Sequence, residues 1–230
     1  MNSVWAASVA AVLITSLPAT ADATEAPVEI QRSHSLPITP DGRVIIAETW
    51  GEIDLKAWDR PTVEVTMTAR TKSGVSEKES EKARGQLERF GFEAKASGPD
   101  EVKVIGIAPS SSLLKPFGGK DRISIQYTIK MPRNAHLKLD HKVGEVRVAG
   151  LAGNIQVANK TGSVTLAVPA TAEATITTST RIGDAELPAA LLANGNYRRR
   201  ALVGHSFTYQ PHEARRQVDI RVGIGSIEID

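Results

Sequence analysis

The sequence of 230 residues contains no cysteine. This absence excludes disulfides, thiolate metal sites and cysteine nucleophiles, and it also removes the acylation site of a lipoprotein. Charge of either sign is not in large excess, because 28 Lys and Arg face 26 Asp and Glu, a net charge of +2. Such a balance does not argue for a nucleic-acid partner, which calls for a concentrated basic patch. A mean hydropathy of -0.17 excludes a polytopic membrane protein.

Motifs for catalysis and metal binding are also missing. The five histidines form no His-x-His or His-Glu-x-x-His pattern, so we expect no metal site. No Gly-x-Ser-x-Gly elbow and no phosphate-binding glycine loop occurs. The sequence therefore predicts a protein with no cofactor, no metal and no catalytic residues. The histidines are His34, His136, His141, His205 and His212.

The N-terminal residues 1–23 have the pattern of a signal peptide. The apolar run "VWAASVAAVLITSL" is too short to span a bilayer, and two Ala-x-Ala-like cleavage sites end at Ala21 and Ala23. No basic residue precedes the run, and a buried N-terminal helix is the alternative interpretation. We expect export to the periplasm or cell surface, with no transmembrane span after cleavage. Residues 24–40, with three prolines, are expected to form an N-terminal leader before a single β domain over 41–230.

Most of that domain shows the alternation of β-strands. Apolar and polar residues alternate in 51–57, 63–67, 102–104 and 123–131, which indicates strands with one buried face. One segment, 76–91, breaks the rhythm. Ser76 and Glu79 form a capping box, and Ala83, Leu87 and Phe90 form a narrow apolar stripe that ends before Gly91. This pattern predicts one amphipathic helix, packed on its own domain or used to bind a partner.

A short unit recurs along the chain: a glycine followed by polar, apolar, polar and apolar residues. From residue 162 the glycines recur every 21 positions, at 162, 183, 204 and 225, although the unit after Gly204 is out of phase. A fixed period near 20 is typical of a solenoid. Glycine permits a sharp corner, and the strand after it buries its second and fourth residues. We therefore predict an all-β β-helix or β-solenoid of short rungs, with a β-sandwich of short strands as the alternative. The predicted corner glycines are Gly51, Gly144, Gly153, Gly162, Gly183 and Gly225.

The chain resembles the bacterial putative-adhesin domain family over roughly residues 40–230. The resemblance rests on "WGEIDLKAWDRPTVEVTMTA", on "YTIKMPRNAHLKLDHKVGEVRVAGLAGNIQVANKTGSVTL" and on the closing "GIGSIEI". One departure is Lys142-Val143-Gly144, where the family tends to have Asn before Gly. The resemblance implies a β-helical fold of unassigned function and, by its name, adhesion. It implies no particular binding residue.

Outward-facing positions of the repeated units form the candidate binding face, because solenoids bind along extended surfaces. Its members are Glu145, Arg147, Asn154, Gln156, Asp184 and Glu186. Asp184 and Glu186 lie about 7 Å apart on one strand face, a separation found in inverting glycosidases. No aromatic platform neighbours them in the sequence, and nothing buries one carboxyl to raise its pKa. An ordinary solvated face is the alternative.

The sequence thus predicts an exported, non-enzymatic module of the bacterial envelope that binds a polymer, glycan or protein by surface contact. A polysaccharide-active enzyme on a β-helix and a self-assembling scaffold remain alternatives. The scaffold interpretation rests on the last strand, 226–229, because nothing follows it to cover the rung. We expect this strand to pair on one side only, with residues 218–222, and to allow weak self-association.

Overall fold

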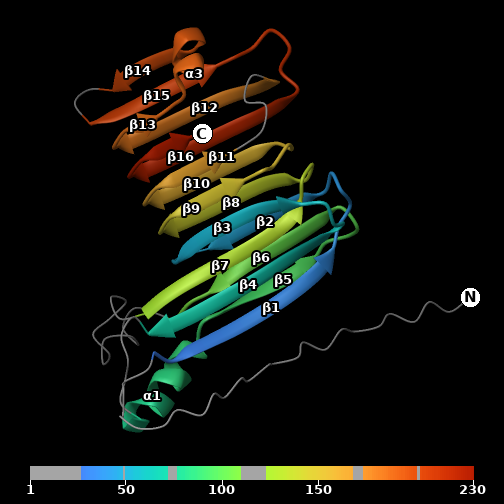
Figure 1. Cartoon of the computed structure of the whole chain (residues 1–230), viewed down its shortest axis with the longest axis vertical. Helices are drawn as coiled ribbons and strands as arrows, with labels where there is room; N and C mark the ends of the chain where they lie inside the picture. Colours follow the sequence, from blue (N-terminus) through green and yellow to red (C-terminus); the bar gives the residue numbers. More distant parts are fainter. Residues whose placement is uncertain (1–26, 49, 72–76, 110–122, 168–172, 201–202) are drawn as a thin grey trace, which may run out of the picture.

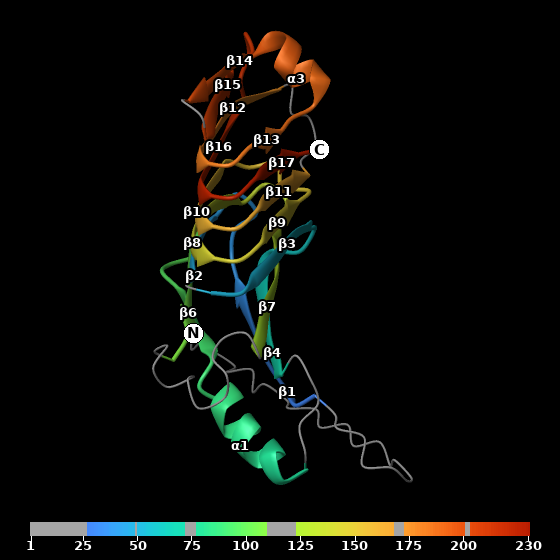
Figure 2. The ribbon, with the colours of Figure 1, turned by 90° about the vertical axis from the view of Figure 1, so that its left-hand side faces the viewer.

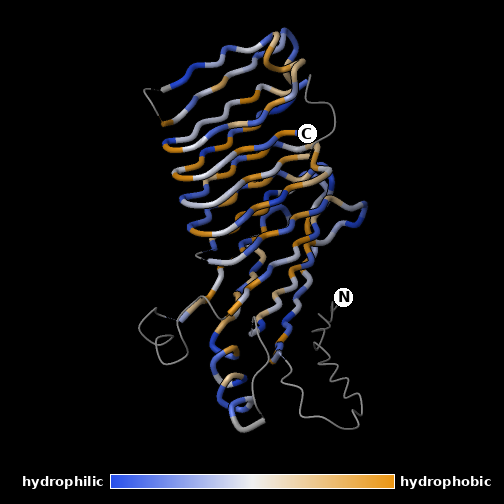
Figure 3. The backbone as a smooth tube through the Cα atoms, turned by 60° about the vertical axis from the view of Figure 1, so that its left-hand side comes forward, coloured by the Kyte–Doolittle hydropathy of each residue, from blue (hydrophilic) through white to orange (hydrophobic). Residues whose placement is uncertain are grey.

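The computed structural model describes residues 27–48, 50–71, 77–109, 123–167, 173–200 and 203–230. Strands dominate and form two mixed sheets that face each other in an elongated stack (Figures 1 and 2). The prediction of an all-β protein is confirmed. Buried aliphatic side chains from both sheets make one continuous core along the stack, as the alternating hydropathy of the strands in Figure 3 shows. The predicted signal peptide lies outside the described residues.

The first sheet has eight strands in the order β1-β4-β7-β3-β9-β11-β17-β13. Strands β3, β9, β11, β17 and β13 pair in parallel, while β1, β4 and β7 are joined by antiparallel pairs. The bounds are β1 Glu29–Pro37, β3 Glu52–Trp58, β4 Thr62–Thr71, β7 Ile123–Pro132, β9 Val146–Ala149, β11 Val164–Ala167, β13 Ala185–Glu186 and β17 Ile227–Ile229.

The second sheet has nine strands in the order β14-β15-β12-β16-β10-β8-β2-β6-β5. Its parallel centre runs from β12 to β6, and antiparallel hairpins add β14–β15 at one end and β5 at the other. The bounds are β2 Arg43–Glu48, β5 Gly91–Ala96, β6 Glu101–Ile107, β8 His136–Val143, β10 Ile155–Thr161, β12 Ala174–Ile182, β14 Asn196–Arg200, β15 Gly204–Tyr209 and β16 Arg216–Ile224.

Five strands of the nine-stranded sheet lead through a glycine at the corner into the next strand along the chain, which belongs to the eight-stranded sheet. We call each such strand pair a rung. The passage from β6 to β7 runs through residues 110–122, outside the described part. In spatial order the rungs are β2–β3, β8–β9, β10–β11, β16–β17 and β12–β13. The second and fourth residues after each corner glycine face the core, as the sequence pattern predicts, and Val164 and Leu166 are fully buried.

The rung order differs from the sequence order, which corrects the expectation that each 21-residue step adds the next turn. The C-terminal rung β16–β17 lies between β10–β11 and β12–β13. Gly204 does not open a rung. It begins β15, which pairs antiparallel with β12 and buries Phe207 completely. Strand β15 pairs along one edge of β12. The next strand, β16, therefore pairs with the other edge of β12 and lies between β12 and β10.

The last strand therefore has no open edge, contrary to the expectation from the sequence. Strand β17 pairs with β11 on one side and with β13 on the other, and it does not pair with residues 218–222. Beyond β12–β13, the stack ends in the β14–β15 hairpin and in helix α3, Ala189–Asn194, which contributes buried Leu191 (Figure 1). Neither α3 nor this hairpin was anticipated from the sequence.

The opposite end of the stack holds the predicted helix. Helix α1, Glu77–Leu87, lies against β1 and β4, and its stripe of Ala83, Leu87 and the following Phe90 is buried. The prediction of a helix packed on its own domain is confirmed, although Ser76 lies outside the described residues. Gly91 does not end the helix in a left-handed conformation, because it already belongs to β5. Residues 29–37, expected to belong to a leader, form β1 and pair along their length with β4.

Candidate functional site: a basic groove on the nine-stranded sheet

A column of glycines sets the geometry of the corners where the two sheets meet. Five of the six predicted corner glycines have φ between +128° and +141°. In four of them a side chain would collide with the carbonyl oxygen of the glycine in the neighbouring rung: Gly144 on Gly51, Gly162 on Gly144, Gly225 on Gly162, and Gly183 on Gly225. The sixth, Gly153, lacks the positive φ, yet a side chain there would meet the Ala135 carbonyl.

Buried polar side chains lie inside these corners, on five of six neighbouring strands of the nine-stranded sheet. They are register partners from strand to strand, in the order Glu48, His141, Asn159, Thr180 and His205, with the apolar Val222 between Asn159 and Thr180. All five polar side chains are less than 5% exposed. We call this set the buried polar row. Sequence reasoning treated these positions as ordinary strand residues.

The buried polar row hydrogen-bonds the corner carbonyls. His141 Nε2 donates to the Gly51 carbonyl at 3.0 Å, and Asn159 Nδ2 donates to the Gly144 carbonyl at 3.0 Å. His141 Nε2 therefore carries the ring proton when the ring is neutral. Burial lowers the pKa of His141, against the smaller opposing effect of hydrogen bonds with backbone groups of Gly51, Glu48 and Val143. The carbonyls of Gly51 and Gly144 thereby gain a hydrogen-bond partner that water would otherwise supply.

The far end of the row is held by a second histidine. Thr180 Oγ1 donates to the Gly183 carbonyl at 3.0 Å, so its oxygen accepts from His205 Nδ1 at 2.8 Å. Tyr197 stacks on the His205 ring with 5.7 Å between ring centroids. Burial lowers the pKa of His205, and the carboxylate of Asp184 opposes that shift. The near end is Glu48, whose charge adds to burial in raising the pKa of Tyr127.

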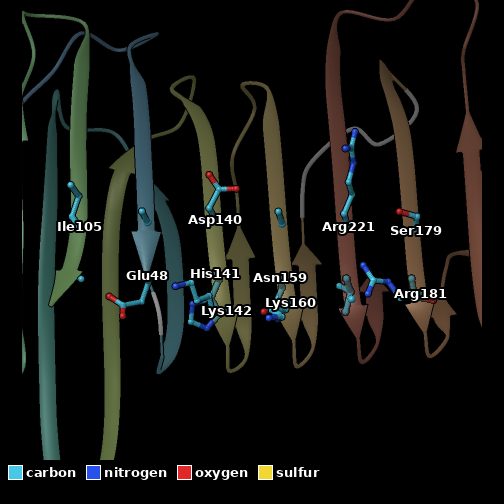
Figure 4. Close-up of a pocket in the computed structure, with 16 residues that line it drawn as sticks. Glu48, Ile105, Asp140, His141, Lys142, Asn159, Lys160, Ser179, Arg181 and Arg221 are labelled. Atoms are coloured by element: carbon cyan, nitrogen blue, oxygen red, sulfur yellow. The ribbon is translucent and has the colours of Figure 1, made fainter. Parts of the chain in front are cut away.

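A groove of about 660 Å³ lies above this row, on the outer face of the nine-stranded sheet (Figure 4). Its outward residues fall in two cross-strand rows. The first contains Ala47, Asp140, Ala158, Arg221 and Ser179, and the second contains Lys142, Lys160, Gly223 and Arg181. The groove is hollow because Ala47 and Ala158 have small side chains and Gly223 has none. The cations lie beside this hollow.

Three of these cations are exposed and form no ion pair within the part of the chain that the structure describes: Lys142, Lys160 and Arg181. Arg221 differs, because its guanidinium makes two hydrogen bonds to the Asp219 carboxylate at 3.1 and 2.7 Å. The lining also contains two acids, Asp140 and the buried Glu48, against the four cations. The groove therefore carries an excess of positive charge.

The face predicted from the sequence is divided by the structure. Glu145, Arg147, Asp184 and Glu186 belong to the eight-stranded sheet or its corners, whereas Asn154 and Gln156 are exposed on the nine-stranded sheet. Glu145 and Arg147 pair with each other. Asn154 Oδ1 accepts a hydrogen bond from the Gln217 backbone amide at 2.8 Å, which holds the chain at the start of β16. These six residues do not form one continuous surface.

The carboxylate pair considered for catalysis has unfavourable chemistry. Asp184 is exposed, and hydrogen bonds from the Ala185 amide and the Tyr197 hydroxyl lower its pKa. A general acid needs the opposite shift. Among the described residues, no three His, Asp or Glu side chains gather as metal ligands would. No helix there is long and apolar enough to cross a membrane.

Other basic residues near the β12–β16 and β14–β15 strands make local contacts or lie exposed. Arg216 donates to the Leu151 carbonyl at 2.8 Å, and Arg215 lies 3.9 Å from Glu173. Arg198 and Arg199 are exposed on β14, with Arg198 lining a second groove of about 650 Å³ on the nine-stranded sheet.

Comparisons with known proteins give remote likenesses only. No family profile and no curated protein matches the sequence. One similar solved structure is a putative cell adhesion protein from Clostridium sporogenes, with 11% identity and a TM-score of 0.48; the match covers 87% of this chain and 99% of that one. A second is a putative adhesin from Bacteroides fragilis, with 10% identity and a TM-score of 0.27; the match covers 87% of this chain and 97% of that one. A putative lipid binding protein from Parabacteroides distasonis matches with 8% identity, a TM-score of 0.24 and coverage of 87% and 96%. Likenesses at this level carry no argument about function.

Proposed function

We propose that this protein is an exported, non-enzymatic module of the bacterial envelope that binds its partner along the outer face of a β-solenoid. The solenoid interpretation is supported by five rungs whose neighbours pair in parallel and in register. The glycine corners supply the repeated bend, and stacked rungs share one core. The predicted corner glycines are structural in this proposal.

The observation that carries the binding role is the groove on the nine-stranded sheet. In-register parallel strands place equivalent side chains about 4.8 Å apart, so one residue type repeated in several rungs becomes a linear array. Lys142, Lys160 and Arg181 occupy the same position of their rungs, two residues before the corner glycine. An array of this kind suits an extended partner better than a small molecule.

Neither rival function gains support from a specific observation. Catalysis lacks an acid with a raised pKa at the Asp184–Glu186 pair, where the Asp184 pKa is lowered. Assembly through the C-terminal strand lacks an open edge, because β17 is paired on both sides.

The test is a binding screen with the purified protein, after removal of residues 1–23, against immobilised neutral glycans, anionic glycans and extracted envelope polymers. We expect saturable binding to at least one polymer without release of shorter fragments. Fragment release would favour the enzyme, and no binding to any polymer would refute the proposed function. N-terminal sequencing of exported material tests the export step, and we expect it to begin at Asp22 or Thr24.

A further inference from the structure

The groove beside Lys142 continues across the nine-stranded sheet into the groove on β14–β15. The residue register passes directly from Asp140 to Ala158, Arg221, Ser179, Ser206 and Arg198, on six neighbouring strands. Ser179 lines the first groove and Ser206 the second, and the two residues are register partners. We call this row the outer track. With about 4.8 Å between strands, it is about 24 Å long.

Cations gather along the outer track on one side. Lys142, Lys160 and Arg181 lie level with one another across their strands, next to the track (Figure 4). Lys142 and Lys160 are on adjacent strands, about 4.8 Å apart, and Gly223 separates Lys160 from Arg181 by about twice that distance. Arg198 adds a cation at the far end.

Several cations elsewhere on the sheets pair with an acid two residues earlier on the same strand. Lys56 pairs with Asp54 at 2.8 Å, and Lys103 pairs with Glu101 at 3.2 Å. At the corresponding position Lys160 has Ala158 and Arg181 has Ser179. Lys142 has Asp140 there, yet the two form no ion pair among the described contacts. The track therefore presents cations that are available to an external anion.

Apart from Asp140 and the cations, the outward polar groups that line the two grooves are hydroxyls and amides. Ser179 lies in the first groove, and Asn196, Ser206 and Thr208 line the second. Such groups exchange hydrogen bonds with sugar hydroxyls. The combination of spaced cations with neutral hydrogen-bonding groups matches a linear chain of sugars that carries repeated carboxylates.

A bilayer surface fits less well. The exposed apolar side chains Val143, Ile182 and Ile224 do form a ridge at the corners. Across the corner glycines, however, Glu145 and Asp184 follow on the other sheet and are exposed. An anionic membrane that contacted the ridge would meet these acids as well as the lysines.

We propose that the outer track binds a linear anionic polysaccharide, with Lys142, Lys160 and Arg181 contacting its carboxylates. This inference rests on the proposed function and names the ligand class and the site. The polymer crosses the strands at right angles, so that successive carboxylates meet successive rungs.

The test measures binding of the purified protein to polygalacturonate, with dextran as the neutral polymer and phosphatidylglycerol vesicles as the anionic membrane. The main variant is Lys142→Glu/Lys160→Glu. The matched control is Lys138→Glu, on the same strand and face as Lys142 but about 13 Å away. Thermal melting confirms that each variant is folded.

We expect the double variant to bind polygalacturonate at least about tenfold more weakly, which corresponds to about 1.4 kcal/mol, with Lys138→Glu within about twofold of wild type. Added salt weakens wild-type binding, because the contacts are exposed. Equal binding by the double variant and wild type overturns the site, and binding to dextran alone or to vesicles alone overturns the ligand class. In those cases the protein can still be a binding module that uses another ligand or another surface. If the protein binds no polymer at all, both the proposed function and this inference are refuted.

Discussion

The glycine column makes a sharp prediction about stability. Gly162 has φ +128°, and a side chain there would collide with the Gly144 carbonyl oxygen. That carbonyl also accepts the hydrogen bond from Asn159 Nδ2. Gly162→Ala therefore forces a backbone conformation that costs about 1–3 kcal/mol and displaces a buried hydrogen bond of about 1 kcal/mol. We expect a loss of about 3 kcal/mol or more in the free energy of unfolding.

The assay is thermal and denaturant unfolding followed by circular dichroism. For a chain of this size, about 3 kcal/mol lowers the melting temperature by about 6–12 °C. Gly85→Ala is the matched control, because Gly85 lies in helix α1 and a methyl group added there would meet no atom within 4 Å. That change should be neutral or stabilise by up to about 1 kcal/mol through helix propensity. A Gly162→Ala protein as stable as Gly85→Ala would refute the stacked-corner geometry.

Three further outcomes are expected. Leu166→Ala should cost about 2–5 kcal/mol because Leu166 is fully buried, whereas Thr165→Ala should cost under about 1 kcal/mol; equal losses in chemical denaturation would show that the register is wrong. Because burial lowers the pKa values of His141 and His205, their stabilisation is complete above the unfolded pKa of about 6.5 and is lost as pH falls below it, so His141→Gln should flatten the decline in melting temperature between pH 6.5 and 5. Glu228→Val should remain as monomeric as wild type in light scattering because β17 is paired on both sides, and concentration-dependent association would contradict that pairing.

The sequence predicts the strands that follow the corner glycines because one face of each of these strands is turned to the core. Alternation at Val164 and Leu166 determines which side chains point inward, and the glycine that precedes them marks the corner. Rung order could not be obtained in this way. The units beginning at Gly183 and Gly225 have the same pattern, and only the antiparallel pairing of β15 with β12 places the last unit before the previous one in space.

The sequence does contain a sign of the groove, but it lies in the residues before each glycine, whereas the repeated unit was defined by the residues after it. Reading backward, Lys142, Lys160 and Arg181 each stand two residues before a corner glycine, and His141, Asn159 and Thr180 each stand three before it. Three of the six glycine units are therefore preceded by a buried polar residue and an exposed cation. The sequence could have shown this repetition, but the pairing of Ser179 with Ser206, which joins the two grooves, depends on the hairpin.

The most direct test of binding along the nine-stranded sheet is a lysine acetylation footprint, read by mass spectrometry, with and without bound polygalacturonate. Lys142 and Lys160 lie on the track, and Lys56 lies on the opposite sheet. The acetylation rates of Lys142 and Lys160 should fall at least about fivefold on binding, because a bound carboxylate pairs with each amine and covers it. The rate at Lys56 should stay unchanged. Protection of Lys56, or equal rates at Lys142 and Lys160 with and without the polymer, would contradict binding along this face.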